Sequence, residues 1–108
     1  MRIAIIDDLE MDARQLADQV STYMSTHRIP ADTPEIFPGG EEFLAGFMPG
    51  VYDIIFLDIY MNGINGMETA RKIRLWDISC HIIFVTTSSD FAVDSYEVKA
   101  AYYLIKPT

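Results

Sequence analysis

The sequence predicts an α/β fold built on a parallel sheet. Short apolar runs recur along the 108 residues, stretches with helical periodicity separate them, and turn-forming Gly, Pro and Asn residues lie between the two kinds of segment. Apolar runs of this length, bounded by turn signals, are typical of strands that are buried on both faces. Helical crossovers return each strand in the same direction, so we expect the strands to be parallel.

The first half of the chain contains two predicted strands and two predicted helices. Residues 2–6 form an apolar run, and residues 11–27 form an amphipathic helix because apolar side chains recur there at spacings of three and four. Residues 33–37 are predicted to be a short edge strand, since Pro34 has no N–H to donate to a ladder. The two glutamates that open residues 41–47 favour the first turn of a short helix.

The second half continues the alternation. Residues 54–57 form an apolar strand, residues 67–75 a helix and residues 81–85 a β-branched strand. A short helix is predicted over residues 91–98, because Ser and Asp residues that suit a helix N-cap precede it. Residues 101–105 close the chain as a strand. The sequence has no internal repeat, low-complexity tract or linker, so we expect one domain.

Composition and charge narrow the class of protein. Half of the residues are hydrophobic and 22% are charged, as in ordinary globular domains. The net charge of −8 is a poor match for a phosphate backbone, so this segment is not expected to bind nucleic acid itself. The single cysteine, Cys80, fits a reducing compartment and is expected to be a buried thiol. With no apolar run of membrane-spanning length, we expect a soluble, cytoplasmic domain without a membrane partner.

Charged and hydroxyl side chains stand where the apolar runs stop. Asp7 and Asp8 follow the first run, Asp58 the third, Thr86 the fourth and Lys106 the fifth. Chemistry in open α/β sheets collects outside the carboxyl ends of the strands, so these five side chains are expected to converge there. Three carboxylates held together repel one another, and a divalent cation removes the repulsion. Oxygen ligands without His or Cys favour Mg²⁺ over Zn²⁺.

The remaining two groups of this constellation suit a phosphoryl group. The hydroxyl of Thr86 and the ammonium of Lys106 can position and neutralise phosphoryl oxygens, which is most of what phosphoryl transfer requires. An aspartate such as Asp58 is an acceptable nucleophile and would give an acyl phosphate.

These residues carry a resemblance to a known family. The residues that carry the resemblance are, in chain order, Asp7, Asp8, Asp58, Thr86, Lys106 and Pro107. In this order and spacing they resemble the CheY-like receiver domain of bacterial two-component response regulators, over residues 2–107. The resemblance implies a flavodoxin-like, doubly wound sheet of five parallel strands in the order 2-1-3-4-5. Residues 57–74 look most like regulators of the AgrA type, which carry a C-terminal LytTR DNA-binding domain.

The resemblance implies a phosphoacceptor and a metal site. Asp58 would accept a phosphoryl group from a sensor histidine kinase. Asp8 and Asp58 would ligate Mg²⁺ or Mn²⁺, Asp7 would act mostly through a bound water, and the main-chain carbonyl of Tyr60 would be a further ligand. The domain would catalyse only its own phosphorylation and dephosphorylation, and it would control transcription through a DNA-binding domain outside these residues.

The resemblance also implies a conformational switch. Lys106 would contact the phosphoryl oxygens, with a cis peptide bond to Pro107. Thr86 would swing toward the phosphoryl group and Tyr103 would follow it inward, so that a new charge of about −1.5 to −2 biases a two-state element. An aromatic residue in a strand near a sheet edge equally suits packing, so both interpretations of Tyr103 stay open.

The chain differs from the family pattern where it stops. A receiver continues past Thr108 into a fifth helix, which would lie beside the helix of residues 11–27. We therefore expect a truncated domain without its fifth helix. Apolar surface on that face would be uncovered, and self-association is expected.

Three other functions use similar residues. A phosphatase of the haloacid dehalogenase type needs a second aspartate two residues after the nucleophile, where this chain has Tyr60. A flavodoxin-like FMN carrier needs a Ser, Thr or Gly cradle after the first strand, where Asp7 and Asp8 would repel phosphate. A receiver-like module that is never phosphorylated would keep the same side chains, and no residue favours it.

Overall fold

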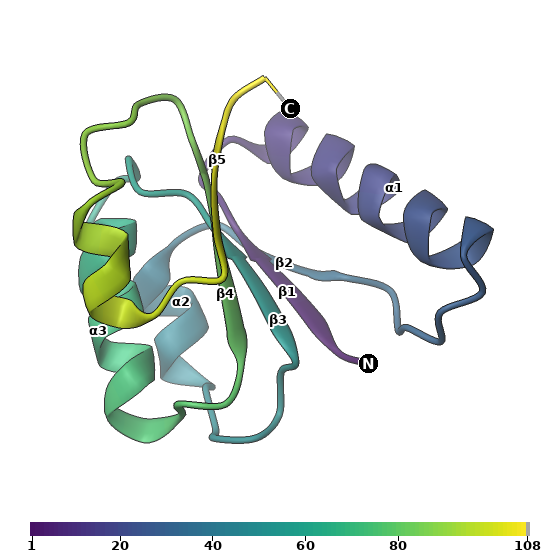
Figure 1. The fold of residues 1–108 in the computed structure, drawn as a ribbon, viewed down its shortest axis with the longest axis horizontal. Coiled ribbons are helices and arrows are strands. Elements are labelled where there is room, and N and C mark those ends of the chain that lie inside the picture. Colours follow the sequence, from purple (N-terminus) through teal and green to yellow (C-terminus); the bar gives the residue numbers. More distant parts are fainter. Residues whose placement is uncertain (108) are drawn as a thin grey trace.

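The structure, a computed structural model, describes residues 1–107 and contains one five-stranded sheet (Figure 1). All neighbouring strands are parallel, and their order is β2-β1-β3-β4-β5. The strands are β1 (Ile3–Ile6), β2 (Glu35–Phe37), β3 (Ile54–Leu57), β4 (His81–Thr86) and β5 (Tyr102–Ile105). The predicted fold class and strand order are confirmed.

Helices lie on both faces of the sheet, in unequal number. Helix α1 (Glu10–Thr26) lies on one face, whereas α2 (Gly40–Ala45), α3 (Gly66–Trp76) and the 3₁₀ helix η1 (Asp94–Val98) lie on the other (Figure 1). Within residues 1–107 there is no helix that is both long and apolar enough to span a bilayer.

The central strands are apolar because both of their faces are covered. All four residues of β1 are buried, and in β4 the residues from Ile82 to Thr86 are buried apart from the half-buried Ile83. Strand β2 pairs only with β1 and is partly exposed, as Pro34 predicted for an edge. The core between the sheet and the three helical segments on one face is filled by large side chains such as Phe43 and Phe84.

Helix α3 begins at a capped turn next to the end of β3. The side chain of Asn65 accepts a hydrogen bond from the backbone N–H of Glu68 at 2.9 Å, which satisfies one of the free donors of the first turn. Met67, Ala70 and Ile73 then recur at a spacing of three and are buried against the core. The predicted helix is confirmed and is longer by one residue at each end.

The predicted helix over residues 91–98 is shorter and tighter than expected. Turns occupy its first part, and only Asp94–Val98 is helical, as a 3₁₀ segment. Eight residues are too few to sustain an α-helix without strong packing. The hydroxyl of Ser95 also donates to the carbonyl of Ala92 at 2.6 Å, and this local bond competes with the helical ladder. Lys99, at a positive φ of 52°, ends the segment.

The face that carries α1 is open beside β5. Tyr103 packs against the opposite core, so the alternation of the strand turns Tyr102 and Leu104 toward the α1 side, where they are 66% and 39% exposed. A cavity of about 330 Å³ lies there. Its lining residues are Asp7, Asp12, Gln15, Leu16, Gln19, Val85, Thr87, Lys106 and Pro107. Within residues 1–107, α1 is the only helix on this face, which agrees with the expectation of an uncovered surface.

The side chain of Asp77 connects two loops at the amino end of the sheet. One of its carboxylate oxygens accepts hydrogen bonds from the N–H and hydroxyl of Ser79 and from the N–H of Cys80, and the other accepts from the N–H of Gly50 at 2.8 Å. Burial alone would raise the pKa of Asp77, but the bonds from Gly50, Ser79 and Cys80 prevail and lower it to about 2. The charged carboxylate therefore fastens the loop before β3 to the turn after α3.

We predict that Asp77→Asn lowers the free energy of unfolding at pH 7 by about 1–3 kcal/mol, because an amide oxygen cannot accept all four hydrogen bonds. The pKa of Asp77 is lower in the folded state, so its stabilisation is present above the ordinary value of 3.8 and is lost as pH falls toward about 2. Urea unfolding at several pH values should show the gap between parent and variant closing over that range. A gap that does not change with pH would contradict this account.

Candidate functional site

The polar residues predicted to converge do lie at the carboxyl end of the sheet. Asp7 and Asp8 directly follow β1, Asp58 follows β3, Thr86 ends β4 and Lys106 follows β5. The backbone N–H of Lys106 donates to the carbonyl of Thr86 at 2.7 Å, which fixes the end of β5 beside the end of β4. Parallel strands in the order β2-β1-β3-β4-β5 place the ends of β1, β3 and β4 side by side.

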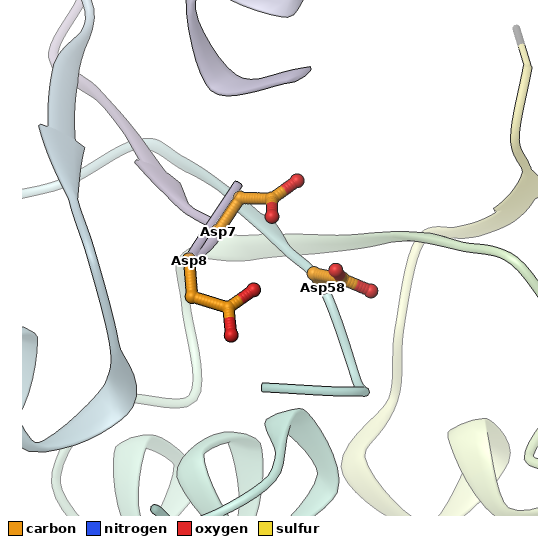
Figure 2. Close-up of side chains that lie close together, drawn as sticks. All are labelled: Asp7, Asp8 and Asp58. Atoms are coloured by element: carbon orange, nitrogen blue, oxygen red, sulfur yellow. The ribbon is translucent and has the colours of Figure 1, made fainter. Parts of the chain in front are cut away.

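Three carboxylates form the acidic part of the site. Asp7, Asp8 and Asp58 each offer one oxygen, and these oxygens lie within 4.8 Å of one another (Figure 2). Asp7 and Asp58 are only 7% and 5% exposed. Oxygen ligands of this kind suit a hard divalent cation such as Mg²⁺. The main-chain carbonyl of Tyr60 stays a predicted further ligand.

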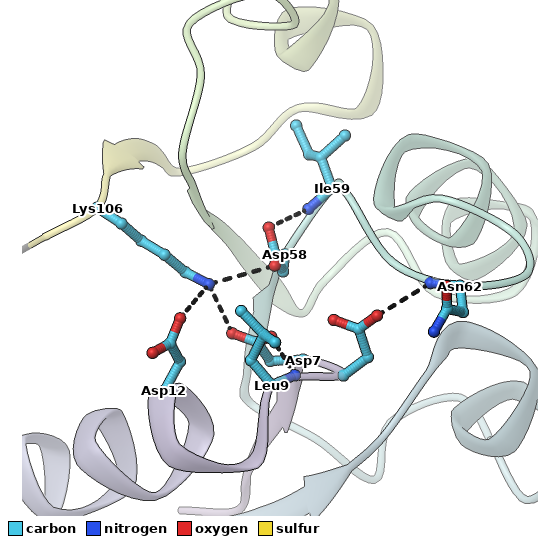
Figure 3. A network of polar contacts seen from close by, with 8 residues as sticks. Asp7, Leu9, Asp12, Asp58, Ile59, Asn62 and Lys106 are labelled. Carbon is cyan, nitrogen blue, oxygen red and sulfur yellow. Dashed lines mark hydrogen bonds and ion pairs between the residues drawn. The ribbon is translucent and has the colours of Figure 1, made fainter.

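Backbone donors fix the orientation of the three carboxylates. The N–H of Leu9 donates to Asp7 at 2.9 Å, and the N–H of Ile59 donates to Asp58 at 2.8 Å (Figure 3). The N–H of Asn62, in the loop between β3 and α3, donates to Asp8 at 3.1 Å. In each carboxylate this bond occupies one oxygen. The second oxygen is left for a cation or for the ammonium of the site.

Lys106 supplies the positive charge of the site. Its Nζ donates to Asp7 at 2.9 Å, to Asp12 at 3.0 Å and to Asp58 at 3.2 Å, so its three N–H donors are all used (Figure 3). Burial would lower the pKa of Lys106, but the hydrogen bonds to Asp7 and Asp12 and the charge of Asp58 outweigh burial and raise it. The raised pKa favours the charged form of the Lys106 ammonium.

The buried carboxylate of Asp58 has a raised pKa. Burial raises its pKa, the charge of Lys106 offsets part of that rise, and repulsion from Asp7 adds to it. A cation held between these carboxylates would favour the charged form of Asp58. The donor set and its electrostatics thus fit a divalent cation.

Thr86 brings a hydroxyl that has no partner of its own. Its side chain is fully buried, and within residues 1–107 Oγ1 makes no hydrogen bond of ordinary geometry, although it lies near enough to the Asp58 carboxylate to lower the pKa of that group slightly. A buried polar group left unpaired costs about 1–3 kcal/mol. An incoming oxygen-rich group would satisfy it, which supports Thr86 as a ligand-binding residue.

Tyr103 and Pro107 complete the residues singled out from the sequence. The ring of Tyr103 lies 5.9 Å from that of Phe84, and its hydroxyl donates to the carbonyl of Ser88 in the loop after β4. The packing interpretation of Tyr103 therefore holds in this structure, and its role as a switch stays a prediction. The Lys106–Pro107 peptide bond is cis.

Sequence reasoning missed two residues of the site. Gly66 is one, because a Cβ there would overlap the carbonyl oxygen of Asp58, and its N–H donates to the carbonyl of Ile59 at 2.8 Å. A glycine that opens a helix just after an N-cap asparagine was the available signal. Asp12 is the other. It lies 94 positions from Lys106 along the chain, and no sequence pattern connects them.

We predict that Gly66→Ala lowers the free energy of unfolding by about 1–3 kcal/mol, because the added methyl group overlaps the backbone that carries Asp58. Gly46→Ala is the matched control, since a Cβ at Gly46 meets nothing within 4 Å. Urea unfolding of both variants measures the difference. Equal stability of the two variants would show that the close approach at Gly66 is not required.

Comparison with known proteins bears on this site. A sequence profile of the response regulator receiver domain matches residues 3–108. The sensory transduction protein LytR of Staphylococcus epidermidis is 33% identical over 107 residues, which are 99% of this chain and 40% of the relative. The transcriptional regulatory protein LytR of Staphylococcus aureus is 37% identical over 67 residues, which are 62% of this chain and 27% of the relative. The chain thus spans less than half the length of these curated relatives.

A solved structure has the same fold. The response regulator TrrA of Thermotoga maritima, solved in complex with Mg²⁺ and BeF, superposes with a TM-score of 0.77 at 28% identity. The match covers 97% of this chain and 85% of that chain.

Proposed function

This chain belongs to the family of response regulator receiver domains, and we propose that Asp58 is the residue in it that accepts a phosphoryl group. One observation carries the proposal. The buried carboxylate of Asp58 lies close to two further carboxylates, Asp7 and Asp8, and one of its oxygens accepts a hydrogen bond from the ammonium of Lys106. Its second oxygen is fixed by the N–H of Ile59. That combination can hold a cation and a phosphoryl group together.

The proposed reaction is transfer from a phosphohistidine of a sensor kinase. A carboxylate oxygen of Asp58 attacks the phosphorus, an O–P bond forms, and the bond from phosphorus to the histidine nitrogen breaks. The imidazole leaves with the electron pair and takes up a proton from water. The signal ends by hydrolysis. Water attacks the phosphorus, the carboxylate of Asp58 leaves, and inorganic phosphate is released. The domain acts on no other substrate in this scheme.

The residues around Asp58 have separate tasks in the proposed transfer. Lys106 stays charged and donates to phosphoryl oxygens, and the unpaired hydroxyl of Thr86 donates to another. Mg²⁺ or Mn²⁺, when held by Asp7, Asp8 and Asp58, supplies positive charge that offsets the carboxylates and the phosphoryl oxygens. The geometry of the three carboxylates supports this cation site.

The proposed switch connects Thr86 with Tyr103. A phosphoryl group adds a charge of about −1.5 to −2 and draws the Thr86 hydroxyl toward it. Ser88, whose carbonyl accepts the hydrogen bond from Tyr103, lies two residues after Thr86, in the loop that follows β4. A movement of this loop changes the support of Tyr103 and shifts the population of two conformations of the β4–η1 surface.

The output of the switch is proposed to be transcription. The relatives include a transcriptional regulatory protein, and the residues of this chain resemble regulators with a C-terminal LytTR domain. DNA would be contacted by such a domain, since the segment described here carries a net charge of −8. The kinase that supplies the phosphoryl group and the reduced thiol of Cys80 both fit the cytoplasm.

We predict that the parent chain gains the mass of one phosphoryl group when it is incubated with Mg²⁺ and acetyl phosphate, and that Asp58→Ala gains none. Asp53→Asn is the matched control, because it removes a carboxylate at the opposite end of β3. Intact-mass spectrometry measures the gain, and chelation of Mg²⁺ should abolish it. A parent sample that is folded by circular dichroism yet gains no mass would favour a module that works without phosphate.

The open face beside β5 is proposed to bind a second copy of the chain. We predict that the average mass in light scattering rises with protein concentration, because exposed apolar side chains such as Tyr102 and Leu104 are buried by association. Leu104→Lys should weaken the association. Leu75→Lys, which changes an exposed leucine on α3, should not. A parent chain that stays monomeric at high concentration would exclude this association.

A further inference from the structure

Lys106 has a carboxylate partner that the proposed reaction does not use. Asp12 lies in the first turn of α1, and its Oδ2 accepts a hydrogen bond from Lys106 Nζ at 3.0 Å (Figure 3). The group of carboxylates that can hold a metal contains Asp7, Asp8 and Asp58 but not Asp12. Asp12 therefore faces the ammonium from the α1 side and not the cation site.

The contact between Asp12 and Lys106 matters because the ammonium of Lys106 has no spare N–H donor. An ammonium has three donors, and Asp7, Asp12 and Asp58 use all of them. A phosphoryl oxygen can receive a hydrogen bond from Lys106 only when one of these carboxylates gives up its own. Asp7 and Asp58 have a second task at the cation site, whereas Asp12 has none. Asp12 thus competes directly with a phosphoryl group for Lys106.

The charge balance points the same way. Four carboxylates and one ammonium leave a net charge of −3 at the site, counting Asp12. A divalent cation reduces this to −1, and the same site without Asp12 would be neutral. An anionic phosphodonor therefore approaches a negative site instead of a neutral one. The side chain of Asp12 is 40% exposed, so water weakens the effect without removing it.

We propose that Asp12 is a positioning residue that holds Lys106 toward α1 and offsets its charge. It acts through Lys106, and it lowers the affinity of the site for a phosphoryl group while raising the affinity for a divalent cation. This inference rests on the proposed function, because it concerns how readily Asp58 is phosphorylated.

Asp12 also has an ordinary structural role that must be separated from this one. A carboxylate in the first turn of a helix is stabilised by the helix dipole. Glu10 has the same role in the same turn of α1, but its ion pair is with Arg14 at 2.8 Å, away from the site. Glu10→Gln is therefore the control that removes a first-turn charge without touching Lys106.

The test compares Asp12→Asn with Glu10→Gln in two measurements. Calorimetric titration with Mg²⁺ alone should give a Kd about two- to fivefold higher for Asp12→Asn, because a nearby negative charge is lost. At saturating Mg²⁺, the initial rate of phosphorylation by acetyl phosphate should rise about three- to tenfold for the same reason. Glu10→Gln should leave both quantities within about twofold of the parent. Asp12→Glu, which keeps the charge, should restore parent behaviour.

Opposite shifts of cation affinity and phosphorylation rate are the signature of a counter-charge. A site that was only loosened would lose both, and that result, or no change in either, would overturn the proposal. If Asp12→Asn does not fold by circular dichroism, Asp12→Ser removes the charge and keeps an oxygen for the first turn. If the parent chain is never phosphorylated, the proposed function fails, and the Mg²⁺ titration still decides whether Asp12 contributes its charge to the site.

Discussion

The repulsion among carboxylates at one edge of the sheet is partly offset by a single ammonium, and the geometry of the site follows from the attraction between them. Asp7 and Asp58 are almost completely buried, where like charges cost more than they do in water. Lys106 reaches them from the end of β5, and its backbone is fixed to Thr86 at the end of β4. The parallel sheet is what brings these distant segments within reach of one another.

The fold holds these groups in place by means that do not use their reactive oxygens. Backbone N–H groups occupy one oxygen of each carboxylate, and the missing side chain of Gly66 lets α3 approach the carbonyl of Asp58. The hydroxyl of Thr86 is buried without a partner. This arrangement would become more favourable if a cation and a phosphoryl group were bound, as the proposed function requires.

The open face and the site are continuous. The cavity beside α1 is lined by Asp7, Asp12 and Lys106 as well as by apolar side chains such as Leu16 and Val85. Any segment that covers this face would lie next to the charges that govern Asp58. A segment that covers the open face would therefore also lie beside the charged groups of the site. Asp12, at the start of α1, lines the cavity and contacts Lys106, so it belongs to both regions.

The sequence by itself determined the order of the elements and the residues at the strand ends. Alternating apolar runs and helical periodicity predicted the parallel sheet, and Asp7, Asp58 and Lys106 were placed correctly because a residue that follows a parallel strand must lie at its carboxyl end. Only the tertiary structure showed the contact between Asp12 and Lys106 and the close approach at Gly66, since both depend on how a helix packs against the sheet. Periodicity reports which face of a helix is buried, but it does not report which side chain that face meets.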